Sequence, residues 1–103
     1  MPNIMKLMKQ AASMQKDMER VQGELAQKTV EFSAGGGMVT ATARGDGTLA
    51  RLKIDPKVVN PAEVDLLEDL VTAAVDGALT AAKDMAAKEL GKVTAGLNIP
   101  GFG

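Results

Sequence analysis

The sequence contains no cysteine and no histidine. Most zinc sites, nucleophilic triads and proton shuttles that work near neutral pH depend on thiolate or imidazole side chains, so these sites are excluded. An enzyme would have to use carboxylates, lysine, serine and threonine, and no pattern of these residues converges on a site. We therefore expect no catalytic activity, no metal and no cofactor.

Aromatic residues are scarce. Tryptophan and tyrosine are absent, and Phe32 and Phe102 are the two phenylalanines. Proteins that bind single-stranded nucleic acid stack the bases on aromatic side chains. If this chain binds nucleic acid, duplex is therefore the better candidate.

Long apolar runs are also missing, and no segment approaches the length of a membrane span. Lys6 and Lys9 interrupt the apolar residues near the N-terminus, where a secretory signal would be continuous. The length of 103 residues suits one small domain. We expect a soluble intracellular protein with one domain over residues 1–95 and a flexible tail over residues 96–103.

The net charge of −1 conceals an uneven distribution. Residues 1–28 carry five basic and three acidic side chains, whereas residues 61–90 carry two basic and seven acidic ones. The first segment is therefore mildly basic and the second is acidic. Four of the acids, at positions 63, 65, 68 and 69, lie where a second helix is expected to begin. We interpret them as helix electrostatics rather than as a metal or acid–base site.

Apolar residues recur at alternating spacings of three and four between Asn3 and about Lys28. They are Ile4, Leu7, Ala11, Met14, Met18, Val21 and Leu25. This unbroken heptad seam predicts a helix roughly 39 Å long. We interpret the methionines of the seam as a packing surface for another helix rather than as a ligand site.

The following segment predicts a meander of three antiparallel strands. A two-residue turn at Asp46-Gly47 would place Ala43 opposite Ala50, Ala41 opposite Leu52 and Val39 opposite Ile54. A four-residue loop over residues 35–38 would add a preceding strand, with Val30, Phe32 and Ala34 on the same apolar face. The other face would be mostly polar and would carry Arg44, Arg51 and Lys53.

Two sharper interpretations of this segment are rejected. The triplet Gly35-Gly36-Gly37 lies between strands and lacks the lysine and helix start of a phosphate-binding loop. The triplet Arg44-Gly45-Asp46 resembles an adhesion motif, but the hairpin already accounts for each of its residues. We therefore expect no nucleotide and no adhesion receptor to bind here.

Asn60-Pro61-Ala62-Glu63 is a strong helix start, and the helix it opens should continue to about Leu90. The predicted fold is α+β with the order α-β-β-β-α. Strands of about six residues span only about 20 Å, so both helices must extend past the sheet. A second copy could cover the exposed seam, and we predict a homodimer with Leu7, Met14, Met18 and Val21 at the interface.

Three blocks carry a family resemblance: "LMKQAASMQKDMERVQGELAQKTVE", "GGGMVTATARGDGTLARLKIDP" and "LLEDLVTAAVDGALTAAKDMAAKELGKVTAGL". In this order and spacing the chain resembles the YbaB/EbfC family of small bacterial nucleoid-associated proteins. The resemblance implies an α-β-β-β-α protomer in the cytoplasm, at the nucleoid. It also implies a homodimer joined through the sheet region, with tweezer-like helices that engage duplex DNA. Many relatives carry an aromatic residue and Asn-Asp at positions 75–77, where Val75 and Gly77 could loosen the helix.

Basic residues on the first helix are the candidate DNA contacts. In the heptad frame, Lys6, Lys9, Lys16 and Arg20 fall on the two positions that face away from the seam. A solvated face would explain such a stripe, but with the family resemblance it becomes the preferred phosphate contact. Arg44, Arg51 and Lys53 are the second choice. The alternative function is a protein-interaction module whose paired helices clasp another protein.

Overall fold

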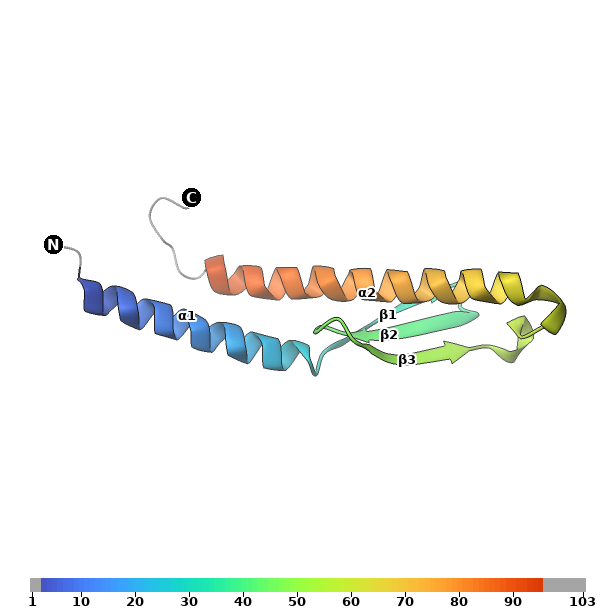
Figure 1. Ribbon diagram of the computed structural model, residues 1–103, viewed down its shortest axis with the longest axis horizontal. Coiled ribbons are helices and arrows are strands. Elements are labelled where there is room, and N and C mark those ends of the chain that lie inside the picture. Colours follow the sequence, from blue (N-terminus) through green and yellow to red (C-terminus); the bar gives the residue numbers. More distant parts are fainter. Residues whose placement is uncertain (1–2, 96–103) are drawn as a thin grey trace.

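The computed structural model describes residues 3–95 and has the predicted α-β-β-β-α order (Figure 1). The expectation of a flexible tail over residues 96–103 lies outside this range. The elements are α1 Ile4–Leu25, β1 Thr29–Ala34, β2 Val39–Arg44, β3 Leu49–Ile54, two short 3₁₀ turns η1 Pro56–Val58 and η2 Pro61–Glu63, and α2 Val64–Ala95.

Asparagine side chains cap both helical segments. The Asn3 side chain accepts a hydrogen bond from the Lys6 backbone N–H at 3.2 Å, and that of Asn60 accepts from the Ala62 N–H at 3.0 Å. The predicted helix start at Pro61 is a 3₁₀ turn that leads directly into α2. At its other end α2 extends beyond the predicted Leu90 to Ala95. These ends agree with local capping chemistry.

The sheet has the order β1-β2-β3 and is antiparallel throughout. The loop over residues 35–38 and the pairs Val39–Ile54 and Ala41–Leu52 are as predicted. The second turn differs, because the Arg44 N–H donates to the Thr48 carbonyl and the Gly47 N–H to the Arg44 carbonyl. This is a three-residue loop with Gly47 at φ 89°.

The longer turn changes one predicted pair. Ala43 lies opposite Leu49 rather than Ala50, and a bulge restores the expected register at Thr42 and Arg51. A bulge inserts one residue into one strand, and here that residue is Ala50. The bulge therefore keeps the apolar face intact despite the different turn.

The core is a close contact between α2 and the sheet. Its fully buried residues are Val39, Ala41 and Ala43 on β2 and Ala74, Ala78 and Ala82 on α2. Alanine on both surfaces allows the helix and the sheet to approach closely. Gly77 lies within the unbroken helix, and a Cβ atom there would overlap the Phe32 ring. Gly77 therefore makes room for Phe32 instead of interrupting α2.

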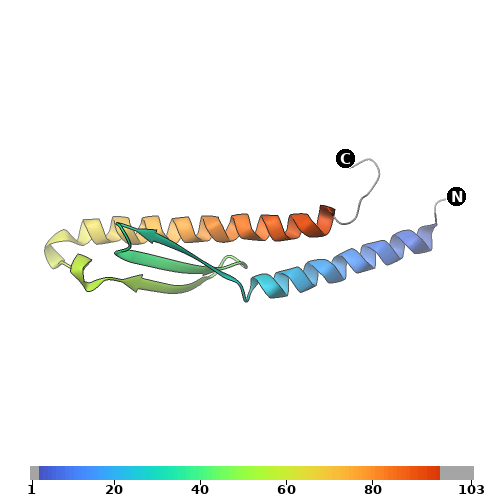
Figure 2. The same cartoon turned by 180° about the vertical axis from the view of Figure 1, so that it is seen from behind.

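The molecule is elongated, with extents of 73 × 24 × 16 Å. Helix α1 continues the long axis away from the sheet, and the C-terminal part of α2 runs alongside it (Figures 1 and 2). Val21 and Leu25 are the buried residues of α1. No other described residue covers the N-terminal part of the seam, as the predicted overhang requires.

Candidate nucleic-acid interface

Three lysines of α1 are free to meet an anion. Lys6, Lys9 and Lys16 are exposed, and none of them forms an ion pair within residues 3–95. Lys6 and Lys9 line a shallow hollow of about 360 Å³ together with Asn3 and Met5. Helix α1 begins at the end of the molecule farthest from α2's first turn (Figure 1). All four predicted stripe residues are thus exposed, and the three lysines have no ion-pair partner within residues 3–95.

Arg20 has a different environment from the lysines. Its guanidinium donates to Glu24 Oε1 at 3.0 Å and lies 4.0 Å from Asp17 Oδ1. It also lines a hollow of about 450 Å³ between α1 and α2, to which Glu89 and Lys92 contribute. Because two carboxylates of its own helix surround it, Arg20 must exchange these partners before it can bind a phosphate.

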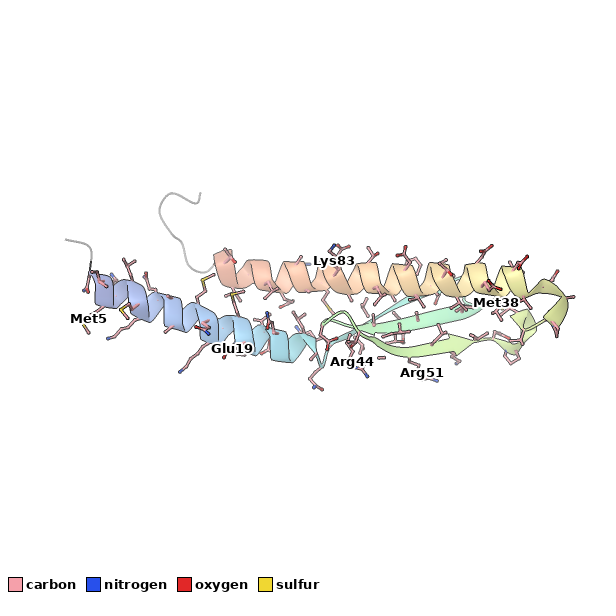
Figure 3. All side chains as sticks on the ribbon, viewed as in Figure 1. Met5, Glu19, Met38, Arg44, Arg51 and Lys83 are labelled. Carbon is pink, nitrogen blue, oxygen red and sulfur yellow. The ribbon has the colours of Figure 1, made fainter. Side chains whose placement is uncertain are left out.

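The second candidate surface is the sheet face that α2 leaves open. Figure 3 shows Arg51 pointing away from α2 and Lys83 pointing away from the sheet, on the opposite side of the molecule. Arg44 is held within its hairpin, where its guanidinium donates to Thr48 Oγ1 and to the Leu49 carbonyl, both at 3.3 Å. Arg51 and Lys53 are exposed. This surface offers fewer free cations than α1.

The Arg44-Gly45-Asp46 triplet is used within the fold. Asp46 Oδ1 accepts hydrogen bonds from the Thr48 hydroxyl and backbone N–H, which lower the pKa of the Asp46 carboxyl below its usual value of 3.8. Gly45 is buried against α1, and a Cβ atom there would lie 2.7 Å from the Leu25 carbonyl oxygen. The triplet therefore builds the turn and its junction with α1.

An ion-pair network that the sequence did not reveal ties the start of the sheet to α2. Glu89 lies 3.7 Å from Lys28 Nζ and accepts a hydrogen bond from Lys92 Nζ at 3.2 Å. The Lys92 hydrogen bond and the charge of Lys28 lower the pKa of the Glu89 carboxyl. Lys28 and Glu89 are distant in sequence, so no local pattern could have paired them. The network sets α1 against α2 at the point where α1 leaves the sheet.

The predicted interface residues of the seam differ in exposure. Leu7 is 56% exposed, and Met14 and Met18 are half-buried. Val21 is buried within the chain, where it lies beside Val93 in the hollow between the helices. Three of the four residues thus remain accessible to a second copy.

A metal site requires a cluster of ligand side chains, and a membrane span requires a long apolar helix. Over the described range, no group of three acidic, histidine or cysteine residues could hold a metal ion. Within the same residues, no helix has the length and hydropathy needed to cross a membrane. The hollows named above are open surface features lined by charged side chains.

Several relatives are similar to this chain over nearly its whole length. A protein from Alkaliphilus metalliredigens is 49% identical over 101 residues, which cover 98% of this chain and 89% of that protein. A protein from Acetivibrio thermocellus is 53% identical over 101 residues, covering 97% and 89%. One from Granulibacter bethesdensis is 51% identical over 100 residues, covering 97% and 94%. All three are named nucleoid-associated proteins.

The fold also matches a solved structure. A crystal structure of an uncharacterized protein from Helicobacter pylori superposes with a TM-score of 0.78 at 19% identity and covers 92% of this chain and 99% of that one. This similarity supports the α-β-β-β-α fold. Residues 1–97 match the sequence profile of the YbaB/EbfC DNA-binding family. Together with relatives at about half identity over nearly the whole chain, this match establishes that the chain belongs to the YbaB/EbfC DNA-binding family.

Proposed function

We propose that this protein is a nucleoid-associated protein of the bacterial cytoplasm that binds duplex DNA as a homodimer, mainly through phosphates. The observation that carries the proposal is the projecting α1, which presents Lys6, Lys9 and Lys16 in solvent without carboxylate partners in the described chain. Flexible ammonium groups suit contacts with phosphates, which do not depend on base sequence. Family membership and the names of the relatives support DNA as the partner.

Arg20 has a secondary part in this proposal. A phosphate that approaches the C-terminal half of α1 would compete with Asp17 and Glu24 for the guanidinium. Because Arg20 already has these partners, its net gain on binding DNA is smaller than that of a free lysine. We therefore rank Lys6, Lys9 and Lys16 as the principal contacts.

Exposed apolar side chains support the homodimer. Ile4 and Leu7 on α1, Phe32 on edge strand β1, and Leu49 and Leu52 on edge strand β3 are all exposed in the single chain. Open strand edges and apolar patches of this kind are typically covered by another chain. A two-fold axis would present the α1 lysines twice, which doubles the number of phosphate contacts.

The alternative is a clasp for another protein, which the acidic first half of α2 favours. Residues 55–76 carry six acidic side chains and one basic side chain. Such a surface repels DNA but suits a basic protein. It lies at the end of the molecule opposite the α1 lysines, so it does not argue against DNA binding by α1 (Figure 1).

A duplex titration at several salt concentrations tests the proposal. Phosphate contacts release counterions, and log affinity should fall with log salt by about 0.9 for each phosphate neutralised. Some four to six contacts from the dimer would give a slope of about −4 to −5, with little dependence on base sequence. Lys6→Gln, Lys9→Gln and Lys16→Gln in one chain should flatten the slope and weaken binding to every duplex.

The matched control carries Arg51→Gln and Lys53→Gln on the open sheet face. It should keep most of the salt dependence. If this control loses the dependence and the α1 variant keeps it, the sheet is the binding surface. If the unmutated protein shows no salt-dependent duplex binding, the protein clasp becomes the better hypothesis.

A further inference from the structure

The two ends of the molecule carry surfaces of opposite charge, each with exposed apolar side chains. The first surface, which we name the acidic tip, consists of Val59, Glu63, Val64, Asp65 and Leu66. Val59, Val64 and Leu66 are about half exposed, and both carboxylates are in solvent. Residues 61–66 line a shallow hollow of about 470 Å³. Nothing else in the described chain covers these apolar groups.

The second surface, which we name the basic tip, consists of Met5, Lys6, Met8 and Lys9 at the start of α1. Met5 is 70% exposed and Met8 is 66% exposed. In the heptad frame Met5 lies outside the Ile4–Leu7 seam and Met8 flanks it, so a homodimer that covers the seam leaves Met5 accessible. Methionine side chains adapt their shape to the surface they meet, which suits them to docking.

The tips are too far apart to meet within one chain. They lie at opposite ends of the long axis, whose extent is 73 Å (Figures 1 and 2). A contact between them must therefore join different copies. Because the two surfaces are not the same patch, the contact is heterologous and can repeat along a row of molecules.

The charges of the two tips indicate that the molecule docking on the acidic tip is a second copy of this chain. Residues 3–16 contain three lysines and no acidic residue, whereas residues 55–76 carry six acids and one lysine. Opposite potentials steer two surfaces together and fix their orientation, while two like tips repel each other. The basic tip of the chain, which contains methionine, is therefore complementary in charge to its acidic tip, which contains valine and leucine.

We propose that the basic tip of one copy docks on the acidic tip of another, so that homodimers associate end to end. This association does not depend on DNA binding. Lys6 and Lys9 belong both to the basic tip and to the proposed phosphate contacts, so duplex DNA and the acidic tip compete for them. Bound DNA would release the end-to-end contact at those lysines.

Sedimentation velocity of the full chain tests this proposal. The runs compare about 10 mM and about 1 M ionic strength, where charges act over about 30 Å and about 3 Å respectively. We expect species larger than the dimer at low ionic strength and dimer alone at high ionic strength. Dimer alone at both would overturn the proposal.

Charge reversal identifies the surfaces involved. Glu63→Lys with Asp65→Lys makes both tips basic, and Lys6→Glu with Lys9→Glu makes both tips acidic. Each variant alone should remain dimeric at low ionic strength, and a mixture of the two should associate again. The control, Asp76→Lys with Asp84→Lys, makes the same change in charge at exposed positions of α2 outside the tips and should associate as the unmutated protein does. The proposal would be overturned if the control lost end-to-end association to the same extent, or if the mixture of the two variants did not recover it.

DNA titrations separate this proposal from the proposed function. A variant with Glu63→Gln and Asp65→Asn, which removes the acids of the acidic tip without adding cations, should bind duplex with its salt dependence intact although it no longer associates end to end. A short duplex added to the unmutated protein at low ionic strength should disperse the larger species. If the larger species persist in saturating duplex, the two events do not share Lys6 and Lys9. If the species larger than the dimer form normally but the protein binds no duplex, the proposed function fails and the end-to-end contact stands.

Discussion

Glu89 shows how one residue can connect segments that are far apart in sequence. It joins Lys28, just after α1, to Lys92 near the end of α2. Gly45 closes the same junction from the other side, since its N–H donates to the Lys28 carbonyl at 2.9 Å and its Cα faces Leu25. These contacts determine the direction in which α1 leaves the sheet.

The Glu89 network should be visible in the pH dependence of stability. Because the pKa of Glu89 is lower in the folded chain, its contribution is fully present above its usual value of 4.5 and is lost as the pH falls through the folded value. Glu89→Gln should therefore reduce the loss of stability below about pH 4.5. Urea unfolding at one protein concentration, repeated between about pH 3 and pH 6, measures this effect.

Lys28→Gln serves as the matched comparison. The Lys92 hydrogen bond is the largest cause of the pKa shift, so removing Lys28 should remove a smaller part of the pH dependence than Glu89→Gln does. Identical pH profiles for Glu89→Gln and the unmutated protein would contradict the role given to this network.

At the scale of elements, the alanine surface of α2 holds the fold together. Ala74, Ala78 and Ala82 are fully buried against a strand that also presents alanine. Alanine at these buried positions brings the helix close to the sheet, so the contact tolerates little added volume there. The stability of the protomer should therefore depend on the absence of bulk at these positions.

Ala78→Leu tests this dependence. Added methylene groups in a packed contact typically cost about 1–3 kcal/mol, and we expect the free energy of unfolding to fall by that amount. Ala73→Leu is the control, since Ala73 is exposed on the same helix and leucine and alanine have similar helix propensities. Urea unfolding at a fixed protein concentration compares them. Equal stabilities of the two variants would show that the contact is looser than described.

At the scale of the whole molecule, length and charge act together. The chain forms a rod 73 Å long with basic α1 at one end and the acidic start of α2 at the other. The acidic end would disfavour DNA there, so this polarity is consistent with the DNA site that we propose on α1. The same elongated shape leaves much of the α1 seam uncovered. The proposed homodimer uses this seam, whereas the proposed DNA site uses the lysines that face away from it. The two proposed contacts therefore involve different faces of one helix.

Met14→Glu with Met18→Glu tests the homodimer. Two charges placed on the uncovered seam should weaken assembly, because a dimer would have to bury them. Sedimentation at micromolar concentration should find a dimer for the unmutated protein and a smaller mass for the variant. Ala12→Glu with Gln15→Glu adds two acids to α1 outside the heptad seam and should leave the mass unchanged. A monomeric unmutated protein would remove the basis for a paired DNA site.

The sequence alone determined those features that depend on neighbours along the chain. Asn3 and Asn60 cap helices because a short polar side chain reaches the N–H two or three residues ahead. Alternation of apolar residues placed Val39 opposite Ile54 and Ala41 opposite Leu52, since a shift of one residue would expose the apolar face. The stripe of Lys6, Lys9, Lys16 and Arg20 on one side of α1 follows from helical periodicity in the same way.

Only the tertiary structure decided features that depend on contacts between distant segments. Asp46-Gly47 suited a two-residue turn, but Gly45 packs against Leu25 and the chain forms a longer turn with a bulge at Ala50. Gly77 predicted a looser helix, whereas the Phe32 ring occupies the space beside it. Val21 is covered by α2 although its heptad position is equivalent to that of exposed Leu7. In each case the outcome depends on which surfaces meet in space, and spacing along the chain does not contain that information.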